Sequence, residues 1–193
     1  TEGLVQRKGL QQTAAILGIS MKTLCNYYGD QDSVPLSVLL RLLAMHSMSV
    51  DDIPDCSIGF KHDGTFVNRH IPLNNALMRL AGYFLSGGFY RQEKDAYQVD
   101  LAFSEADLRD DMLACIRNVF GTDLNPYINE SRITITNRTI FHVFGEVLGF
   151  SPTARTKRLP PFMFRLPIAK IGSMIAAYFS GNGDVDVRRR TVI

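Results

Sequence analysis

The chain alternates between stretches in which apolar residues recur with a helical period and shorter stretches in which apolar and polar residues alternate. Residues 98–104 alternate strictly, which predicts a strand with one apolar face. That face comprises Val99, Leu101 and Phe103. A capped helix is expected from Ser104 to Gly121, because its apolar residues recur every three or four positions. These residues are Leu108, Met112, Cys115, Ile116 and Val119.

Further helices and strands are predicted on either side of this strand and helix. A helix that ends at Gly88 precedes the first strands, and a second hairpin is expected from residues 126–129 and 132–136. Asn137 then caps a further helix that Gly149 ends. The predicted order is αββαββα, and the predicted fold class is α+β.

A helical domain is expected at the N-terminus. Gly18-Ile19-Ser20 is a tight turn between two short amphipathic helices, with Ser20 as the N-cap of the second. The apolar positions of these helices are Leu10, Ala14, Ile16, Leu17, Ile19, Leu24 and Tyr27. Two short helices joined by such a turn form a helix-turn-helix.

Changes in composition divide the chain into four parts. Residues 1–55 are the helix-turn-helix domain, and residues 56–73, rich in Gly, Pro and polar side chains, are a linker. Residues 74–150 hold the αββαββα unit. Residues 151–193 begin with a basic, proline-containing connector and continue into one more helix and strand.

One stretch occurs twice. Leu80–Gly88 reads LAGYFLSGG and Ile175–Gly183 reads IAAYFSGNG, so each copy ends an apolar helix in small residues and glycine. Small residues permit close approach of two backbones, and a terminal Gly can leave a helix at φ > 0 without a Cβ penalty. The repeat therefore predicts two helices packed against each other.

Both copies resemble the LAGLIDADG motif of homing endonucleases, including those embedded in inteins, and the similarity runs from about Leu77 to the C-terminus. In that family an acidic residue at the penultimate motif position of each helix holds Mg²⁺ over the scissile phosphates. Gly87 and Asn182 occupy these catalytic positions here. Neither supplies the anionic oxygen that Mg²⁺ requires, so no cofactor is expected in this chain.

Two sets of DNA-binding residues follow from resemblance. Gln12 to Ile53 resembles the repressor-type helix-turn-helix domain, whose second helix enters the major groove. Its outward residues would be Met21, Lys22, Thr23 and Asn26. The endonuclease resemblance implies that the polar face of the sheet lies along DNA. The groove-facing residues would be Arg91, Gln92, Gln98, Asp100, Arg132, Thr134 and Thr136.

The second repeat stops early, since the sequence after Asp184 has room for one strand. A DNA saddle of two sheets would then need a missing C-terminal half or a second copy as partner, besides double-stranded DNA. An unpaired strand after Val187 would invite such pairing.

Composition sets the class of the protein. The 193 residues are 46% apolar and 21% charged, as in an ordinary globular protein, and carry three widely spaced cysteines. Unpaired cysteines favour a cytoplasmic, intracellular protein, and no run of about 18 apolar residues predicts a membrane span. The net charge of +2 is too small to indicate nucleic-acid binding, so local basic patches must carry that inference.

Three functions fit these patterns. The first is a degenerate, cleavage-deficient homing endonuclease, with an intein as one possible origin, that binds DNA. The second is a non-enzymatic transcriptional regulator that reuses the endonuclease fold. The third is an active nuclease in which Glu93, Asp184 or Asp186 replaces the lost metal ligands.

Overall fold

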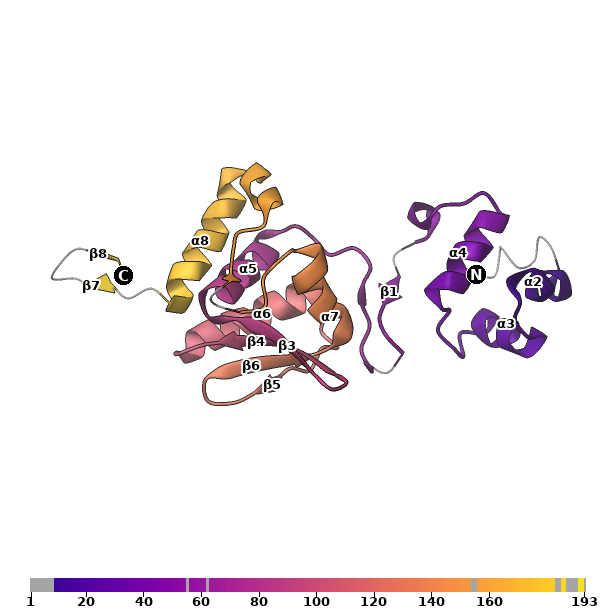
Figure 1. The fold of residues 1–193 in the computed structure, drawn as a ribbon, viewed down its shortest axis with the longest axis horizontal. Coiled ribbons are helices and arrows are strands. Elements are labelled where there is room, and N and C mark those ends of the chain that lie inside the picture. Colours follow the sequence, from indigo (N-terminus) through magenta and orange to yellow (C-terminus); the bar gives the residue numbers. More distant parts are fainter. Residues whose placement is uncertain are drawn as a thin grey trace. The chain divides into compact units, whose positions relative to one another are not determined.

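The computed structural model describes residues 9–54, 56–61, 63–153, 156–182, 185–186 and 191–192. The chain divides into two compact units, Thr1–Cys56 (unit 1) and Ser57–Ile193 (unit 2). In its described part unit 1 is helical, whereas unit 2 combines helices with antiparallel strands (Figure 1). The protein is therefore a mixed helix-and-strand protein.

Unit 1 is a small helical bundle. Its elements are α2 (Leu10–Leu17), α3 (Met21–Tyr28), α4 (Leu36–Met45) and the 3-10 turn η1 (Val50–Asp52). Four side chains from the three helices form its buried core, namely Ala14, Leu17, Leu24 and Leu42. Ile16, expected among the packed residues, is 50% exposed, because it lies on the outer side of α2.

The turn between α2 and α3 follows the predicted pattern. Gly18 ends α2 with φ +69°, a left-handed conformation that glycine adopts without a Cβ clash. Ser20 then caps α3, since its Oγ accepts a hydrogen bond of 3.0 Å from the Thr23 backbone N–H. Three residues thus separate two helices of eight residues each.

Unit 2 contains the elements in the predicted order. They are α5 (Asn75–Gly87), β3 (Phe89–Glu93), β4 (Ala96–Ala102), α6 (Ala106–Phe120), β5 (Tyr127–Ile128), β6 (Arg132–Thr136) and α7 (Arg138–His142). The chain continues through the π-helical turn η2 (Val143–Val147), the 3-10 turn η4 (Pro161–Arg165) and α8 (Ile168–Asn182). Two short strands follow, β7 (Val185–Asp186) and β8 (Thr191–Val192).

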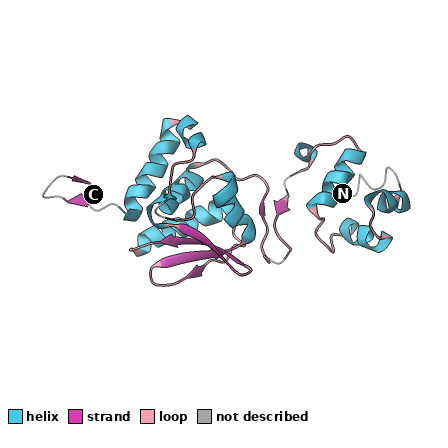
Figure 2. Cartoon of the chain, in the orientation of Figure 1, coloured by secondary structure: helices cyan, strands magenta, loops and turns pink. Residues whose placement is uncertain are grey.

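Four antiparallel strands form the main sheet in the order β3-β4-β6-β5. Val99 pairs with Ile135 and Leu101 with Ile133, and all four side chains are buried on one face. The helices of unit 2 lie on this apolar side of the sheet (Figure 2). The opposite face carries the polar alternation that the sequence predicts.

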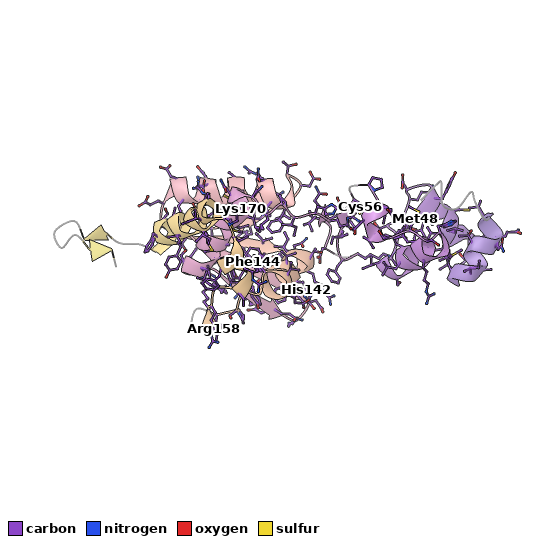
Figure 3. All side chains as sticks on the ribbon, turned by 90° about the horizontal axis from the view of Figure 1, so that it is seen from above. Met48, Cys56, His142, Phe144, Arg158 and Lys170 are labelled. Carbon is purple, nitrogen blue, oxygen red and sulfur yellow. The ribbon has the colours of Figure 1, made fainter. Side chains whose placement is uncertain are left out.

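An aromatic cluster connects α5 with η2 and the segment that follows it. The ring of Phe84 on α5 lies 5.0 Å, between centroids, from both Phe144 and Phe150. All three side chains are buried, and Figure 3 shows Phe144 within the body of unit 2. Tilted aromatic pairs at this separation stabilise a core beyond the area that they bury.

Residues 57–73, which the sequence pattern assigns to a linker, belong to unit 2. They contain the hairpin β1 (Ser57–Ile58) and β2 (Val67–Asn68), whose Val67 is 1% exposed. Asp63 accepts a 2.7 Å hydrogen bond from the Arg138 backbone N–H at the start of α7. A linker pattern and a hairpin rich in turn residues have the same composition, so composition alone does not separate them.

The C-terminal strand expected from Asp184 to Val187 is described only in part. Val185 and Asp186 form β7, which pairs antiparallel with β8. Asp184, Val187 and residues 188–190 lie outside the described residues, as do the side chains from Asn182 onward. The interpretation of an unpaired edge after Val187 therefore stays a prediction.

Candidate nucleic-acid interface

One face of α3 is open to a ligand. Met21, Lys22 and Cys25 are exposed, and Asn26 is half-buried. At about 100° per residue, these four side chains span an arc of about 140° on the helix. The arc does not include Leu24, which is 1% exposed and faces the core. The face offers the thioether of Met21 and the ammonium group of Lys22 in the first turn, and the thiol of Cys25 and the amide of Asn26 one turn later.

Thr23 does not share this face. It is half-buried, and its Oγ1 lies 2.7 Å from Ser20 Oγ within the cap of α3. A hydroxyl that completes an N-cap is committed to the helix. The cap thus accounts for the orientation of the Thr23 side chain without a ligand. The assignment of Thr23 as a base-reading residue stays a prediction.

Cys25 was not among the residues singled out from the sequence. Its thiol is exposed and unpaired, and it lies one turn after Met21 on the same face. The four-residue spacing from Met21 is the sequence feature that indicates this position, since residues i and i+4 share one side of a helix. A small apolar group at this position can contact a thymine methyl group.

The polar face of the sheet carries most of the predicted residues of unit 2. Register places Arg91 opposite Gln98, Gln98 opposite Thr136, and Asp100 opposite Thr134. Arg132 belongs to the same face, and its guanidinium lies 5.0 Å from the centre of the Phe89 ring. These side chains lie on one face of the sheet, across β3, β4 and β6.

Asp100 lies at the centre of this face but is not available to a ligand. Its side chain is fully buried, and Oδ1 accepts a 2.5 Å hydrogen bond from Thr134 Oγ1. Oδ2 lies 3.6 Å from Arg91 Nε, which also donates to Gln98 Oε1 at 3.0 Å. Asp100 therefore orients its neighbours, and the predicted direct contact with DNA does not fit its burial.

Gln92 lies on the other side of the sheet. It follows Arg91 directly, so the two side chains point to opposite faces of β3. Gln92 Nε2 donates a 3.0 Å hydrogen bond to the Tyr97 hydroxyl group of the neighbouring strand. The prediction placed both residues in the groove, and strand geometry permits only one of them there.

The two helices that carry the repeated stretch pack closely, as predicted. A Cβ atom added at Gly82 of α5 would overlap the Met174 carbonyl oxygen and lie 2.9 Å from Ala177 Cβ. A Cβ atom at Gly181 would overlap Ser86 Oγ. The seam between α5 and α8 thus runs along small residues, and these contacts show that the two helices run in the same direction.

Gly87 and Asn182 are the last residues of these two helices. A Cβ atom at Gly87 would lie 3.2 Å from Ala102 Cβ, so the glycine keeps α5 close to β4. The side chain of Asn182 lies outside the described residues. Among the residues that the structure describes, no group of three or more His, Cys, Asp and Glu side chains is placed to bind a metal ion.

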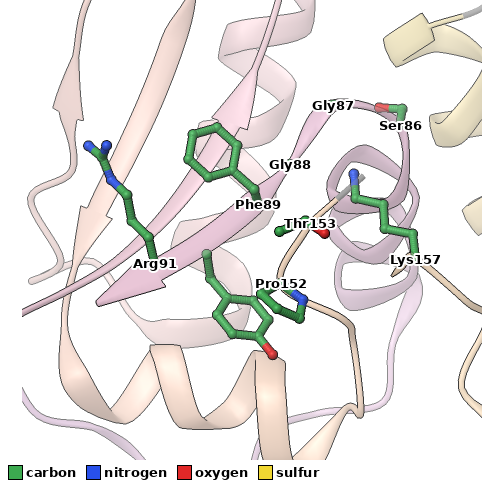
Figure 4. Close-up of a pocket in the computed structure, with 9 residues that line it drawn as sticks. Ser86, Gly87, Gly88, Phe89, Arg91, Pro152, Thr153 and Lys157 are labelled. Atoms are coloured by element: carbon green, nitrogen blue, oxygen red, sulfur yellow. The ribbon is translucent and has the colours of Figure 1, made fainter. Parts of the chain in front are cut away.

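A cleft of about 320 Å³ opens beside the end of α5 (Figure 4). Lys157 lies at its margin and donates hydrogen bonds of 2.6 Å and 3.0 Å to the carbonyl oxygens of Phe84 and Leu85. The ammonium group thereby caps the C-terminus of α5, where a helix favours a cation. Burial lowers the pKa of Lys157 to about 8.

A partly buried polar cluster connects α5 with α6. The Tyr83 hydroxyl group donates a 2.5 Å hydrogen bond to Asp111 Oδ2 and accepts one of 3.1 Å from Arg79. Arg79 also forms a 2.7 Å ion pair with Asp111. Burial raises the pKa of Tyr83 to about 12 and that of the neighbouring Cys115 thiol to about 11. The hydroxyl and the thiol thus stay neutral and serve the packing.

The outer face of α8 carries large apolar side chains. Ile168, Ile175 and Phe179 recur at helical spacing and are 88%, 45% and 47% exposed. No described helix is long and apolar enough to cross a membrane. The expected protein partner, a C-terminal half or a second copy, stays a prediction.

Comparison with known proteins found relatives among DNA polymerases. The chain is 36% identical over 156 residues to the DNA polymerase II large subunit of Thermococcus kodakarensis. It is 22% identical over 195 residues to the protein of the same name from Haloquadratum walsbyi. A DNA polymerase of Thermococcus kodakarensis is 25% identical over 152 residues. No family model matches the chain.

These similarities cover most of this chain but little of the relatives. They include 81%, 95% and 76% of the chain, yet the chain spans only 8% to 9% of the length of each relative. The relatives share a segment with this chain, and most of each relative lies outside it.

The names of the relatives correct the functional assignments made from the sequence. None is named a homing endonuclease, an intein or a transcriptional regulator, so the LAGLIDADG assignment and its two alternatives are contradicted. The roles given to Gly87 and Asn182 rested on that family and are lost with it. The repeated stretch is accounted for by packing, since Gly82 and Gly181 permit two helices to touch whatever the chemistry of the protein.

Proposed function

We propose that this chain is a DNA-binding segment of a larger DNA polymerase protein, and that it contacts double-stranded DNA through α3. The observation that carries the proposal is the match to a DNA polymerase II large subunit, which is 36% identical and extends over 81% of this chain. A DNA polymerase has DNA as its substrate, so an exposed polar helix face in such a segment has an obvious ligand. The proposal concerns binding alone.

The geometry of unit 1 supports α3 as the contacting helix. A turn of three residues joins α2 to α3, and α3 presents its N-terminal residues to solvent. In DNA-binding proteins with this arrangement the second helix lies in the major groove, with its N-terminal side chains against base edges. Asn26 suits adenine, Lys22 suits guanine or a phosphate, and Met21 suits a thymine methyl group.

The distribution of charge supports phosphate binding by unit 2. Residues 1–56 contain more Asp and Glu than Lys and Arg, so unit 1 has little general attraction for phosphates. The segment from Val147 to Asn182 contains Lys and Arg but no acidic residue. Arg158 and Arg165 are exposed there, and Figure 3 shows Arg158 at the periphery of unit 2. These cations would supply the salt-dependent part of the affinity.

The polar sheet face is a second candidate contact. Arg91 is exposed and Arg132 half-buried, while Thr136 adds an exposed hydroxyl group. Arginine and threonine side chains bind phosphates and base edges. Under this proposal the two units, Thr1–Cys56 and Ser57–Ile193, are two DNA-contacting domains.

A binding titration tests the proposal. The 193-residue chain is added to a fluorescent 30-base-pair duplex, and anisotropy is recorded at several salt concentrations. Lys22→Ala is compared with Lys61→Ala, which removes the same charge from an exposed position in unit 2. If Lys22 contacts a phosphate, its loss weakens binding several-fold and reduces the slope of log K against log salt by about 1.

The matched control decides between two sources of affinity. Equal effects of Lys22→Ala and Lys61→Ala would mean that only total charge matters, and α3 would lose its role. Tighter binding to a single strand of the same length than to the duplex would contradict groove recognition. Both results leave the similarity to polymerases intact but refute the proposed contact.

A further inference from the structure

We infer that Asp32 positions Asn26 to read adenine, an inference that rests on the proposed DNA contact of α3. The backbone after α3 brings the two residues together. Asp30 adopts a left-handed conformation with φ +53°, and the Gln31 N–H donates a 3.0 Å hydrogen bond to the Asn26 carbonyl oxygen. The chain therefore folds back along the helix, and Asp32 lies beside the Asn26 side chain.

The contact between the two side chains fixes the orientation of the amide. Asn26 Nδ2 donates a 3.1 Å hydrogen bond to Asp32 Oδ2. An ionised carboxylate accepts hydrogen bonds but donates none, so only the amide nitrogen can face it. The amide group is held with its nitrogen toward Asp32 and its oxygen on the opposite side.

This orientation suits one base. Asn26 retains one N–H of Nδ2 and both lone pairs of Oδ1, because Asp32 uses only the other N–H. In the major groove adenine presents an acceptor at N7 and a donor at N6, which match one amide N–H and one amide oxygen. Guanine presents two acceptors, N7 and O6, and so pairs poorly with the amide oxygen.

The position of Asn26 on α3 agrees with this role. It lies on the exposed arc with Met21, Lys22 and Cys25, one turn after Lys22. An unrestrained asparagine amide can rotate and exchange its donor and acceptor. The hydrogen bond to Asp32 removes one of these orientations before DNA binds, which lowers the cost of ordering the side chain.

Base preference is the measurement that separates the orientation of Asn26 by Asp32 from the general effect of the Asp32 charge on affinity. Duplexes are first selected from a random library by the 193-residue chain. Each adenine in the selected site is then replaced in turn, and competition titrations give the loss of affinity. In the unmodified chain one adenine should show a preference of roughly 5- to 100-fold, and Asn26→Ala should abolish it.

Two variants at position 32 distinguish the effect of the charge from that of the hydrogen-bond acceptor. Asp32→Ala removes both the negative charge and the acceptor. It should raise general affinity about twofold, because a carboxylate near phosphates repels them, and it should reduce the adenine preference about three- to tenfold. Asp32→Asn removes the same charge but keeps an oxygen acceptor, so affinity should rise while most of the preference remains.

The outcomes distinguish the inference from the function on which it rests. Failure of the unmodified chain to enrich any duplex would refute the proposed DNA contact itself. Enrichment with an adenine preference that Asp32→Ala leaves unchanged would refute positioning by Asp32 alone. Equal loss of preference in Asp32→Ala and Asp32→Asn would also refute it, because the acceptor would then be irrelevant. Circular dichroism of both variants confirms that the helices remain folded.

Discussion

Replacing Gly82 by alanine should destabilise unit 2, whereas the same change at Gly172 should not. Gly82 is buried in the middle of α5, and its added Cβ atom would overlap the Met174 carbonyl oxygen and lie 2.9 Å from the Tyr178 backbone nitrogen. Both obstacles are backbone atoms of α8, so no side-chain rotation relieves the overlap. The helices would have to separate by roughly 1 Å to restore ordinary contact.

The two glycines have the same helix propensity but different surroundings. An alanine in a helix interior is favoured over glycine by about 1 kcal/mol. Overpacking of a tight interface costs about 1–3 kcal/mol, and rigid backbone neighbours place Gly82→Ala near the upper end. The net loss should be about 2 kcal/mol. Gly172 in α8 has no heavy atom within 4 Å of an added Cβ, so Gly172→Ala should stabilise by up to about 1 kcal/mol.

Urea unfolding with a probe inside unit 2 measures the difference. Cys115 is 5% exposed in the core, so its alkylation reports opening of unit 2 and not of unit 1. The midpoint for Gly82→Ala should fall by about 1 M urea, and that for Gly172→Ala should stay or rise. Equal shifts of the two midpoints, in either direction, would refute the close contact between α5 and α8.

Two further predictions concern partly buried polar groups of unit 2. Tyr83→Phe removes the hydrogen bond to the Asp111 carboxylate and should lower the free energy of unfolding by about 1–3 kcal/mol in urea titrations. An unchanged midpoint would contradict a stabilising hydrogen bond between Tyr83 and Asp111. Lys157 should make the free energy of unfolding rise with pH between about pH 8 and its ordinary pKa of 10.5. In this range the folded state has released the Lys157 proton while the unfolded state still binds it, so a higher pH favours the folded state. Lys157→Gln should lack that rise in pH-dependent unfolding, and an identical pH profile for both proteins would contradict the lowered pKa.

Packing was the part of the molecule that the sequence predicted best. Apolar periodicity located the helices and strands of unit 2, and the small residues of the repeated stretch predicted the seam between α5 and α8. Both signals are local and depend on residue size and spacing. The same signals carried no information on chemistry, which is why the repeated stretch suggested a family that the relatives contradict.

The candidate site was predicted less well, for reasons that lie in three dimensions. Alternation correctly placed Asp100 on the polar face, but it could not show that Arg91 and Thr134 engage the carboxylate there. Gln92 was placed on the wrong face because strand register was open by one residue. Asp32 was missed because its contact with Asn26 depends on the left-handed turn after α3.

Thiol protection tests the central claim, binding of duplex DNA by the exposed face of α3, most directly. Cys25 lies on that face, whereas Cys56 is half-buried in a loop outside it and serves as the internal control. With saturating duplex, alkylation of Cys25 followed by mass spectrometry should slow at least fivefold while Cys56 reacts at its original rate. Cys25 that reacts equally fast in the free and DNA-bound chain would show that DNA lies elsewhere.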